Sequence, residues 1–226
     1  MALPVMIIGA SGSGKTYSLK QFKKGEIGII SAEKGRLPFK SDIKPIKIPS
    51  SFSSEEINSY AQLNAAKYSW LQMSIKASPF KSIVLDDSQY ILSGEFFDRA
   101  KEKGYDKFTD IAANFRNLIH FINELQDDDK IVYFLHHCET DANGREKIKT
   151  IGKMLDEKLT VEGCFDVVMY CSDYKFFTQS NGQSSAKTPE GMFAELEIPN
   201  DLKAVDTAIR EYYGMKKLEV VKDAKG

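Results

Sequence analysis

The sequence predicts an α/β fold in which a mostly parallel β-sheet carries helices on both faces. Short apolar runs recur along the chain, and they are hydrophobic throughout, as strands covered on both sides must be. Stretches whose apolar residues follow the helical repeat separate these runs, an alternation typical of this fold class. The chain has 226 residues, of which 42% are hydrophobic and 28% are charged. These values fit one domain spanning residues 1–226.

The first predicted elements are two buried strands and an edge strand. Residues 5–8 (VMII) are apolar and precede a glycine-rich turn, after which a helix is expected over residues 14–22. Residues 26–35 (EIGIISAEKG) form a second buried strand that ends in a polar loop. Residues 44–49 (KPIKIP) alternate between polar and apolar and contain two prolines. Because proline has no N–H to donate to a neighbouring strand, this segment is predicted at the edge of the sheet.

A long helix and a third buried strand follow. Ser53 and Glu56 have the spacing of a capping box, which predicts a helix from there to about Lys76. Residues 82–87 (SIVLDD) form a buried strand that ends in two carboxylates. Over residues 109–125 the apolar residues recur every three or four positions, so this stretch is predicted to be helical.

The last part of the sheet is expected from two more buried strands, over residues 131–137 (IVYFLHH) and 165–171 (FDVVMYC). Residues 175–179 (KFFTQ) are a candidate hairpin partner of the second one. Apolar residues at helical spacing predict a final helix over residues 202–212. In open parallel sheets, ligands bind at the carboxyl ends of the strands. Polar motifs follow several of these predicted strands, so a binding site is expected at that edge.

The turn after the first strand has the sequence of a nucleotide-binding loop. Gly9-x-x-x-x-Gly14-Lys15-Thr16 matches the phosphate-binding loop (P-loop) pattern without a gap, and it lies between a predicted strand and a predicted helix, as the motif requires. The glycines allow backbone N–H groups to surround phosphates, and the helix N-terminus adds a favourable dipole. Lys15 is predicted to contact the β and γ phosphates of ATP. The predicted ATP-binding residues are Gly9, Ala10, Ser11, Gly12, Ser13, Gly14, Lys15, Thr16 and Tyr17.

A magnesium site is predicted where the strand over residues 82–87 ends. Asp86 stands at its carboxyl end, where the Walker B aspartate of P-loop ATPases holds Mg²⁺. The Thr16 hydroxyl is expected to be the other protein ligand. Asp87 has two interpretations that the sequence leaves open: it caps the following helix, or it acts in catalysis.

Several classes of P-loop protein do not fit the sequence. GTPases read guanine with an N-K-x-D motif, which the chain lacks. Small-molecule kinases use clustered arginines to clamp phosphate groups, whereas the five arginines of this chain are scattered. The AAA+ class carries a helical lid after its core, and too few residues remain for one. These exclusions leave the RecA-like class.

Three stretches resemble RecA-like ATPases. The stretch IGIISAEKG is similar to the RecA strand that ends in Ala-Glu and carries the catalytic glutamate, and the resemblance gives Glu33 that role. The stretch IVLDDS resembles the Walker B strand. The stretch IVYFLHH resembles the strand whose terminal glutamine senses the γ-phosphate. Here His137 takes that place, and its imidazole can also donate a hydrogen bond to phosphate.

Over residues 5 to 213 the layout resembles the short RecA-core ATPases encoded by tailed phages, which are linked to single-strand DNA annealing and recombination. The similarity is carried by LDDSQYI (85–91), AKEKGYDKFTDI (100–111), IKTIGKMLDEKLTVEG (148–163) and IPNDLK (198–203). The resemblance implies Mg²⁺-dependent ATP hydrolysis and assembly into a ring or filament. It also implies action on single-stranded DNA in recombination, annealing or replication, in a bacterial host cytoplasm. Single-strand-binding or replication proteins are further expected partners.

The segment after residues 131–137 is expected to contact DNA, because RecA-like proteins place a mobile DNA-binding loop there. Residues 145–153 contain four basic residues and Glu146. The predicted DNA-binding residues are Arg145, Lys147, Lys149 and Lys153. A solvated charged helix is the alternative interpretation, since acidic residues follow and the aromatic residues of a base-stacking surface are missing. In RecA-like filaments a lysine near position 187 reaches the neighbouring subunit's phosphates, and the resemblance gives that role to Lys187, although a plain surface lysine also fits.

The composition limits the partners and the compartment. Thirty-one basic and 32 acidic side chains give a net charge of −1, so a nucleic-acid surface must be local. Three cysteines without a C-x-x-C pair favour a reducing compartment. The chain lacks an apolar stretch of the ~20 residues that span a bilayer, and we expect a cytoplasmic protein with no membrane partner. Two other functions stay open: an ATP-dependent scaffold or loader that binds proteins instead of DNA, and a phosphotransferase with an unidentified acceptor.

Overall fold

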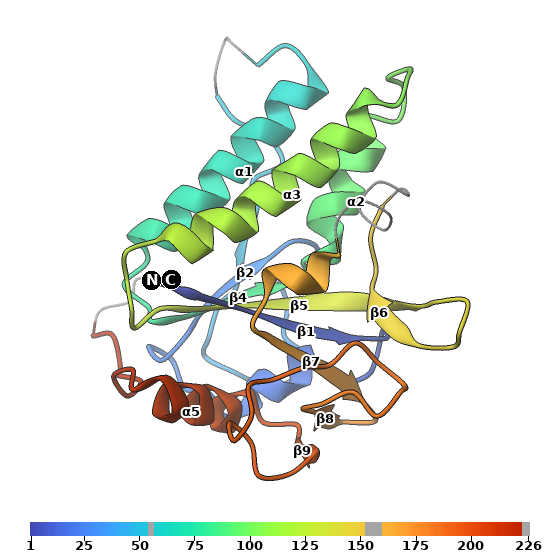
Figure 1. The fold of residues 1–226 in the computed structure, drawn as a ribbon. Coiled ribbons are helices and arrows are strands. Elements are labelled where there is room, and N and C mark those ends of the chain that lie inside the picture. Colours follow the sequence, from blue (N-terminus) through green and yellow to red (C-terminus); the bar gives the residue numbers. More distant parts are fainter. Residues whose placement is uncertain (54–56, 152–159, 223–226) are drawn as a thin grey trace.

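A mostly parallel sheet forms the centre of the molecule (Figure 1). The structure, a computed structural model, describes residues 1–53, 57–151 and 160–222. From one edge to the other the strands are β3 (Ile46–Lys47), β2 (Gly28–Ser31), β4 (Ser82–Asp86), β5 (Ile131–Thr140), β1 (Leu3–Gly9), β7 (Val167–Ser172), β8 (Lys175–Phe177) and β9 (Glu197–Pro199). The strands from β3 to β7 pair in parallel, whereas β8 and β9 are antiparallel additions. The predicted fold class is confirmed.

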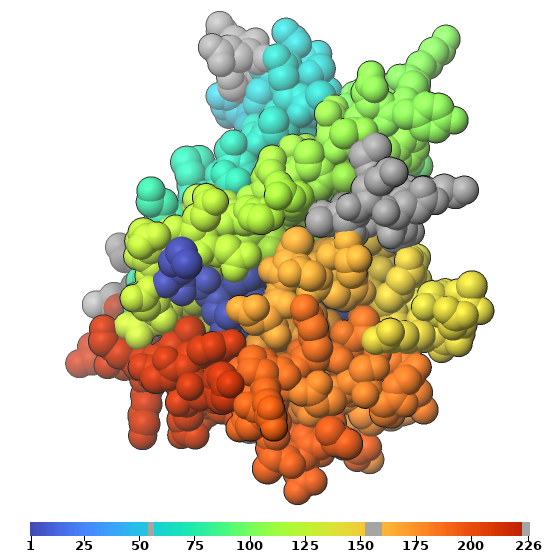
Figure 2. All heavy atoms as spheres, viewed as in Figure 1, coloured from blue at the N-terminus to red at the C-terminus, as the bar shows by residue number. Residues whose placement is uncertain are grey.

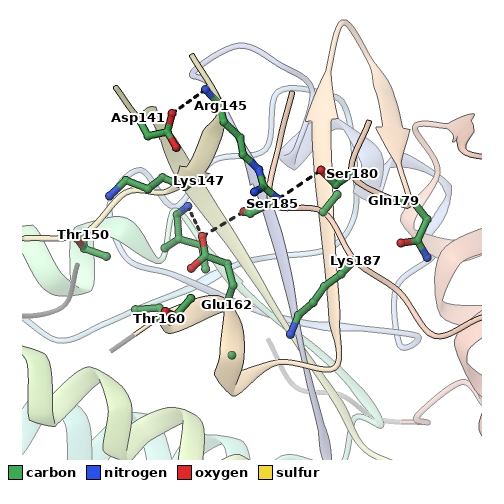
Figure 3. A pocket seen from close by; sticks show the side chains of 14 residues that line it. Asp141, Arg145, Lys147, Thr150, Thr160, Glu162, Gln179, Ser180, Ser185 and Lys187 are labelled. Atoms are coloured by element: carbon green, nitrogen blue, oxygen red, sulfur yellow. Dashed lines mark hydrogen bonds between the residues drawn. The ribbon is translucent and has the colours of Figure 1, made fainter. Parts of the chain in front are cut away.

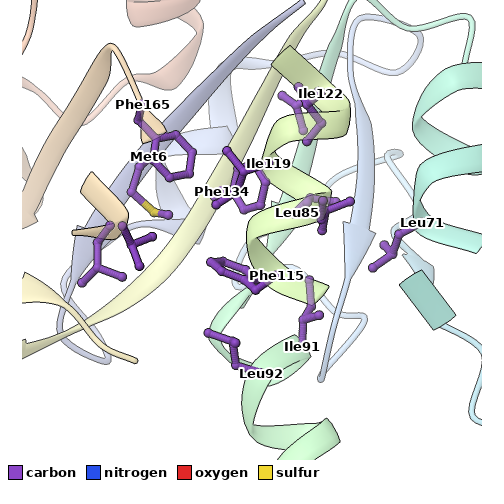
Figure 4. Close-up of a cluster of buried hydrophobic side chains, with 14 of the residues drawn as sticks. Met6, Leu71, Leu85, Ile91, Leu92, Phe115, Ile119, Ile122, Phe134 and Phe165 are labelled. Carbon is purple, nitrogen blue, oxygen red and sulfur yellow. The ribbon is translucent and has the colours of Figure 1, made fainter. Parts of the chain in front are cut away.

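Helices cover both faces of this sheet. The helices α1 (Tyr60–Ala77), α2 (Gln89–Asp98) and α3 (Asp106–Glu124) lie on one face, and α5 (Leu202–Tyr213) lies on the other together with a short 3₁₀ helix, η1 (Thr16–Gln21) (Figure 1). A second 3₁₀ helix, η2 (Val161–Cys164), packs beside α3. Alternate residues of β1 therefore enter two separate cores. Met6 packs with Phe115 and Phe134 under α3 (Figure 4), whereas Ile7 packs toward α5.

The order of the strands brings the polar strand ends together. The strand β5 lies between β1 and β4, and its residue His137 pairs in register with Gly9 at the start of the P-loop. On the other side, Asp86 pairs with Ser31 of β2. Because all four strands are parallel, their carboxyl ends meet at one edge of the sheet, as expected for a ligand site.

Several elements differ from the sequence-based prediction. The helix expected over residues 14–22 is the six-residue 3₁₀ helix η1, which is closed by a hydrogen bond from the N–H of Phe22, the next residue, to Leu19 O. The helix α1 begins after Ser59, whose side chain accepts from Gln62 N, so Ser53 is not its cap; Glu56 lies outside the described residues. The short strand β6 (Glu146–Ile148) was not predicted, and it pairs antiparallel with the end of β5.

A buried ion pair attaches α5 to the sheet. Arg210 Nε donates to Asp206 Oδ1 at 2.6 Å, and both side chains are at most 3% exposed. The second oxygen of Asp206 accepts from Tyr133 OH on β5 at 2.9 Å and from Ser82 Oγ on β4. Arg210 also donates to the carbonyl of Asp129. The pair is therefore compensated by hydrogen bonds, as a buried pair must be.

We expect Arg210→Ala to lower the free energy of unfolding by about 3–5 kcal/mol, because Asp206 would stay buried without its cation. Urea unfolding followed by circular dichroism measures the change. Lys175→Ala is the control, since it removes a solvent-exposed ion pair with Glu197 and should leave the midpoint unchanged. Equal midpoints for the two variants would contradict this role of Arg210.

Candidate nucleotide-binding site

The P-loop turns sharply between β1 and η1, and two glycines are required by its surroundings. A Cβ on Gly9 would lie 2.4 Å from the carbonyl oxygen of Cys171. Gly14 has φ +107°, and a Cβ there would lie 2.4 Å from Asn200 Nδ2. Both positions therefore exclude a side chain, the first by close approach and the second by conformation as well.

Neighbouring segments hold the carbonyl groups of this loop. Tyr174 N–H donates to Ser13 O at 3.0 Å, and Asn200 Nδ2 donates to Gly14 O at 3.0 Å. Cys171 Sγ also lies within hydrogen-bonding distance of Ser13 O. Because these carbonyls are engaged from outside, the loop has a fixed conformation before any ligand binds, which is the preorganisation that phosphate binding needs.

Lys15 is buried within the loop. Its Nζ donates to the carbonyls of Gly9 and Ala10 at 2.7 and 2.8 Å, and burial lowers the pKa of the ammonium group. Ser13 Oγ is buried and has no hydrogen-bond partner among the described residues. A buried hydroxyl without a partner is costly, so a polar ligand in the loop would satisfy it. The loop thus fits a phosphate chemically.

Thr16 and Asp86 meet beside the loop. Thr16 Oγ1 donates to Asp86 Oδ1 at 2.8 Å. Burial, helped by the charge of Asp87, raises the pKa of Asp86 to about 6; a nearby cation would favour the ionised form. A hydroxyl and a carboxylate are the oxygen ligands that Mg²⁺ prefers. The two predicted metal ligands therefore lie together and fit this ion.

Asp87 and His137 form a second pair in the same place. Asp87 has φ +58°, a left-handed conformation that aspartate tolerates better than most residues, and this turns the chain directly from β4 into α2. His137 Nε2 lies 3.5 Å from Asp87 Oδ1. The hydrogen bond with His137 lowers the pKa of Asp87, so this carboxylate is ionised at neutral pH.

These residues line one cleft of about 510 Å³. Of the predicted site residues, the cleft is lined by Ser11, Gly12, Gly14, Lys15, Thr16, Tyr17, Asp86, Asp87 and His137. The sequence reasoning missed five lining residues: Lys34, Arg36, Pro38, Tyr90 and Tyr174. For Lys34 and Arg36 a signal existed, because they follow a strand whose carboxyl end was expected at the site. Tyr174 gave no signal, since it depends on how the β7–β8 turn folds over the P-loop.

Glu33 does not line this cleft. The exposed Glu33 side chain belongs to a neighbouring cavity of about 210 Å³, which it lines with Asn64, Tyr68 and Glu95. The loop after β2 presents Lys34 and Arg36 to the cleft instead. The structure therefore places cations at this side of the cleft, and the carboxylate beside Asp86 is Asp87.

His136 is fully buried on the other face of β5 and connects the site to the chain beyond it. Its Nε2 lies 2.8 Å from Lys149 O, and its Nδ1 lies 2.9 Å from Ser88 Oγ. Burial lowers the pKa of His136 to about 4, so the ring is neutral. Because a carbonyl only accepts, Nε2 carries the proton and Nδ1 accepts from Ser88. His136 thus joins the turn after Asp87 to the residue that follows β6.

A second cavity, of about 640 Å³, lies beside the β5–β6 hairpin (Figure 3). It brings together Arg145, Lys147 and Lys187, with Glu162 between them (Figure 3). Figure 2 shows the hairpin, in yellow, projecting from the surface beside the orange residues that follow β7. Lys149 lies outside this cavity, where its N–H donates to His137 O. Lys153 lies outside the described residues.

Lys187 belongs to this second cavity and not to the nucleotide cleft of its own chain. Its backbone pairs with Val168 of β7 through two hydrogen bonds. The role predicted for Lys187, a contact with a neighbouring subunit's phosphates, stays a prediction.

Comparison with known proteins identifies the family. Residues 1–194 match the model of an AAA domain. No curated protein matches the chain. In the described part of the chain, no helix is both long and apolar enough to cross a membrane. The sequence set the AAA+ class aside for want of a helical lid; the match to an AAA domain covers residues 1–194, which include the P-loop. The chain belongs to the AAA domain family of P-loop, nucleotide-binding ATPases.

Proposed function

We propose that this protein binds ATP with Mg²⁺, hydrolyses it, and acts on single-stranded DNA as a homo-oligomeric ring or filament. One observation carries the enzymatic part: Lys15, the Thr16–Asp86 pair and the Asp87–His137 pair all line the same cleft. A P-loop alone supports nucleotide binding. A partly buried ligand pair for magnesium with an ionised carboxylate beside it supports hydrolysis.

Each group has a role that follows from its position. On ATP binding, Lys15 exchanges the carbonyls of Gly9 and Ala10 for the β and γ phosphates. Thr16 and Asp86 would hold the metal ion. Bound Mg²⁺ would neutralise the charge that develops on the phosphates. Lys34 and Arg36 add positive charge at the opposite side of the cleft.

Asp87 is the carboxylate best placed to act on the attacking water. It is held by His137 and follows the metal ligand directly, so a water between Asp87 and the γ-phosphate would be oriented for attack. His137, which is next to Gly9 in the sheet, would donate to the γ-phosphate from the same side. The geometry favours this assignment over Glu33.

Two tyrosines offer faces for the adenine base. Tyr17 and Tyr174 both line the cleft, with ring centroids 5.3 Å apart in an edge-to-face arrangement. Tyr174 is 54% exposed and has φ +57°. Such a conformation is strained for a bulky residue and is typical of functional positions. An adenine ring would cover apolar surface there.

The β5–β6 hairpin supports DNA binding. Arg145, Lys147 and Lys187 face one cavity, and these cations would contact a phosphate backbone. The hairpin is connected to the nucleotide site through two contacts of Lys149, from its N–H to His137 O and from its carbonyl to the His136 ring. A change at the γ-phosphate would therefore be transmitted to the basic residues of the cavity, and DNA bound there would in turn affect the nucleotide site.

We expect the triple variant Lys147→Ala/Lys149→Ala/Lys187→Ala to bind single-stranded DNA more weakly and to lose DNA-stimulated hydrolysis. Each lost phosphate contact lowers the slope of log affinity against log salt by about 0.7. ATP binding should be unchanged, because none of the three side chains lines the cleft. Fluorescence anisotropy with a labelled oligonucleotide, at two salt concentrations and with an ATP analogue, measures affinity and slope.

The matched control is Lys216→Ala/Lys217→Ala/Lys222→Ala, which removes the same charge from exposed positions after α5. Equal affinity and slope for the two triple variants would reject this surface as the DNA site. If the wild type binds no DNA in any nucleotide state and its hydrolysis is indifferent to DNA, the protein-loader function is favoured. ADP release that requires an added acceptor would instead indicate a phosphotransferase.

A further inference from the structure

An aromatic groove of about 500 Å³ adjoins the nucleotide cleft. We define it by Tyr90, Phe96 and Phe97 of α2 together with Gln89, His137 and Lys149. Phe97 is 71% exposed and Tyr90 39%. Leaving aromatic surface of this size in water forgoes the stabilisation of burial, and such exposure beside a cavity is typical of binding sites.

The helical repeat explains why these side chains share one face. Positions 89, 93 and 97 are four residues apart along α2, and position 90 precedes 93 by three. Residues at these spacings lie above one another on a helix. Gln89, Tyr90, Ser93 and Phe97 therefore line the groove as a row, with Phe97 farthest from the nucleotide site along the helix.

Gln89 gives independent evidence of a ligand. The residue is only 5% exposed, and its side-chain oxygen has no hydrogen-bond partner in the described part of the chain. A buried amide oxygen needs an N–H donor. Each of the four DNA bases carries such a donor on its pairing edge, so an unpaired base satisfies this oxygen without requiring one particular sequence.

The groove also carries positive charge and continues into the basic cavity. Lys149 is exposed at its border, and Thr150 lines both the groove and the cavity that holds Lys147 and Lys187. A strand whose phosphates follow the lysines would thus bring its bases to the aromatic rings. This combination of cations and stacking surfaces is what single-strand binding uses.

We infer that the aromatic groove holds bases of single-stranded DNA, stacked against Phe97 and Tyr90, an inference that rests on the proposed function. The groove shares Tyr90 and His137 with the nucleotide cleft, and their rings meet edge to face with centroids 5.9 Å apart. A base bound in the groove therefore lies next to the residue proposed to contact the γ-phosphate. This contact gives DNA a second route for stimulating hydrolysis.

The test compares Phe97→Ala and Phe97→Trp with wild type in binding to labelled oligo-dT and to an oligonucleotide of equal length with abasic residues. Loss of one base–aromatic stack should weaken oligo-dT binding by roughly 5-fold to 100-fold in Phe97→Ala. Phe97→Trp should bind like the wild type, and the salt slope should not change, since no cation is removed. The abasic oligonucleotide should bind wild type and Phe97→Ala equally.

Tyr212→Ala is the matched control, because Tyr212 is a partly exposed aromatic residue on α5, across the sheet from the groove. Phe97 does not line the nucleotide cleft, so hydrolysis without DNA should be unchanged. Wild-type affinity of Phe97→Ala for oligo-dT would overturn the inference while leaving the proposed function intact. Absence of DNA binding by the wild type would overturn both. A fall in oligomer mass for Phe97→Ala, with unchanged DNA affinity, would show that the groove holds a second copy of the chain instead.

Discussion

Lys15→Ala is expected to abolish ATP binding and hydrolysis. Lys15 is 5% exposed, and its ammonium group donates two hydrogen bonds within the P-loop, so it is held inside the loop that would receive the phosphates. Lys34 and Arg36 belong to the opposite loop and do not replace it. Isothermal titration with ATP and Mg²⁺ measures binding, and phosphate release measures turnover.

The control for Lys15→Ala is Lys23→Ala, which removes an exposed lysine shortly after η1. A thermal unfolding scan of both variants separates loss of the site from loss of the fold. Hydrolysis at the wild-type rate by a folded Lys15→Ala protein would refute the cleft as the ATP site.

Asp87→Asn is expected to leave ATP binding intact and to slow hydrolysis by at least ~100-fold, the usual scale for loss of a general base. The asparagine keeps the shape of the side chain but no longer carries the charge that His137 contacts at 3.5 Å. Glu33→Gln should hydrolyse ATP at nearly the wild-type rate, because Glu33 lines another cavity. Single-turnover rates at saturating ATP separate this chemical step from binding.

The pair of variants also tests the resemblance to RecA-like ATPases, which gave the catalytic role to Glu33. If Glu33→Gln stops turnover and Asp87→Asn does not, the loop after β2 must bring Glu33 into the cleft when ATP binds. Loss of turnover in both would mean that the two carboxylates act together.

The sequence predicted the parts of the site that depend on local rules. The P-loop motif determines its own turn, because close approach and backbone conformation at Gly9 and Gly14 exclude other residues. The positions of Asp86 and His137 followed from where the strands end, since parallel strands that are hydrophobic throughout can only be buried. The motif and the strand ends together predicted that the site lies at the edge of the sheet where the parallel strands end.

The directions of side chains in loops were harder to predict from the sequence, because they depend on contacts between distant segments. Whether Glu33 or Lys34 faces the phosphates is decided by the path of the loop after β2, which carries no periodic pattern. The strand β6 was missed for a related reason. Of its three residues only Ile148 is buried, and the segment is held extended by pairing with β5 and by a bridge from Glu146 to Ser184.

The contacts of α5 and Asn200 have a consequence for where this ATPase ends. The family match stops at residue 194, yet Asn200 holds the Gly14 carbonyl, and Arg210 and Asp206 satisfy the buried polar groups of Ser82 and Tyr133. A fragment cut at the family boundary would expose the part of the sheet that α5 covers and would remove the Asn200 contact from the loop that receives phosphate. The smallest unit that folds and binds nucleotide therefore extends through α5, and a fusion partner or affinity tag belongs after that helix.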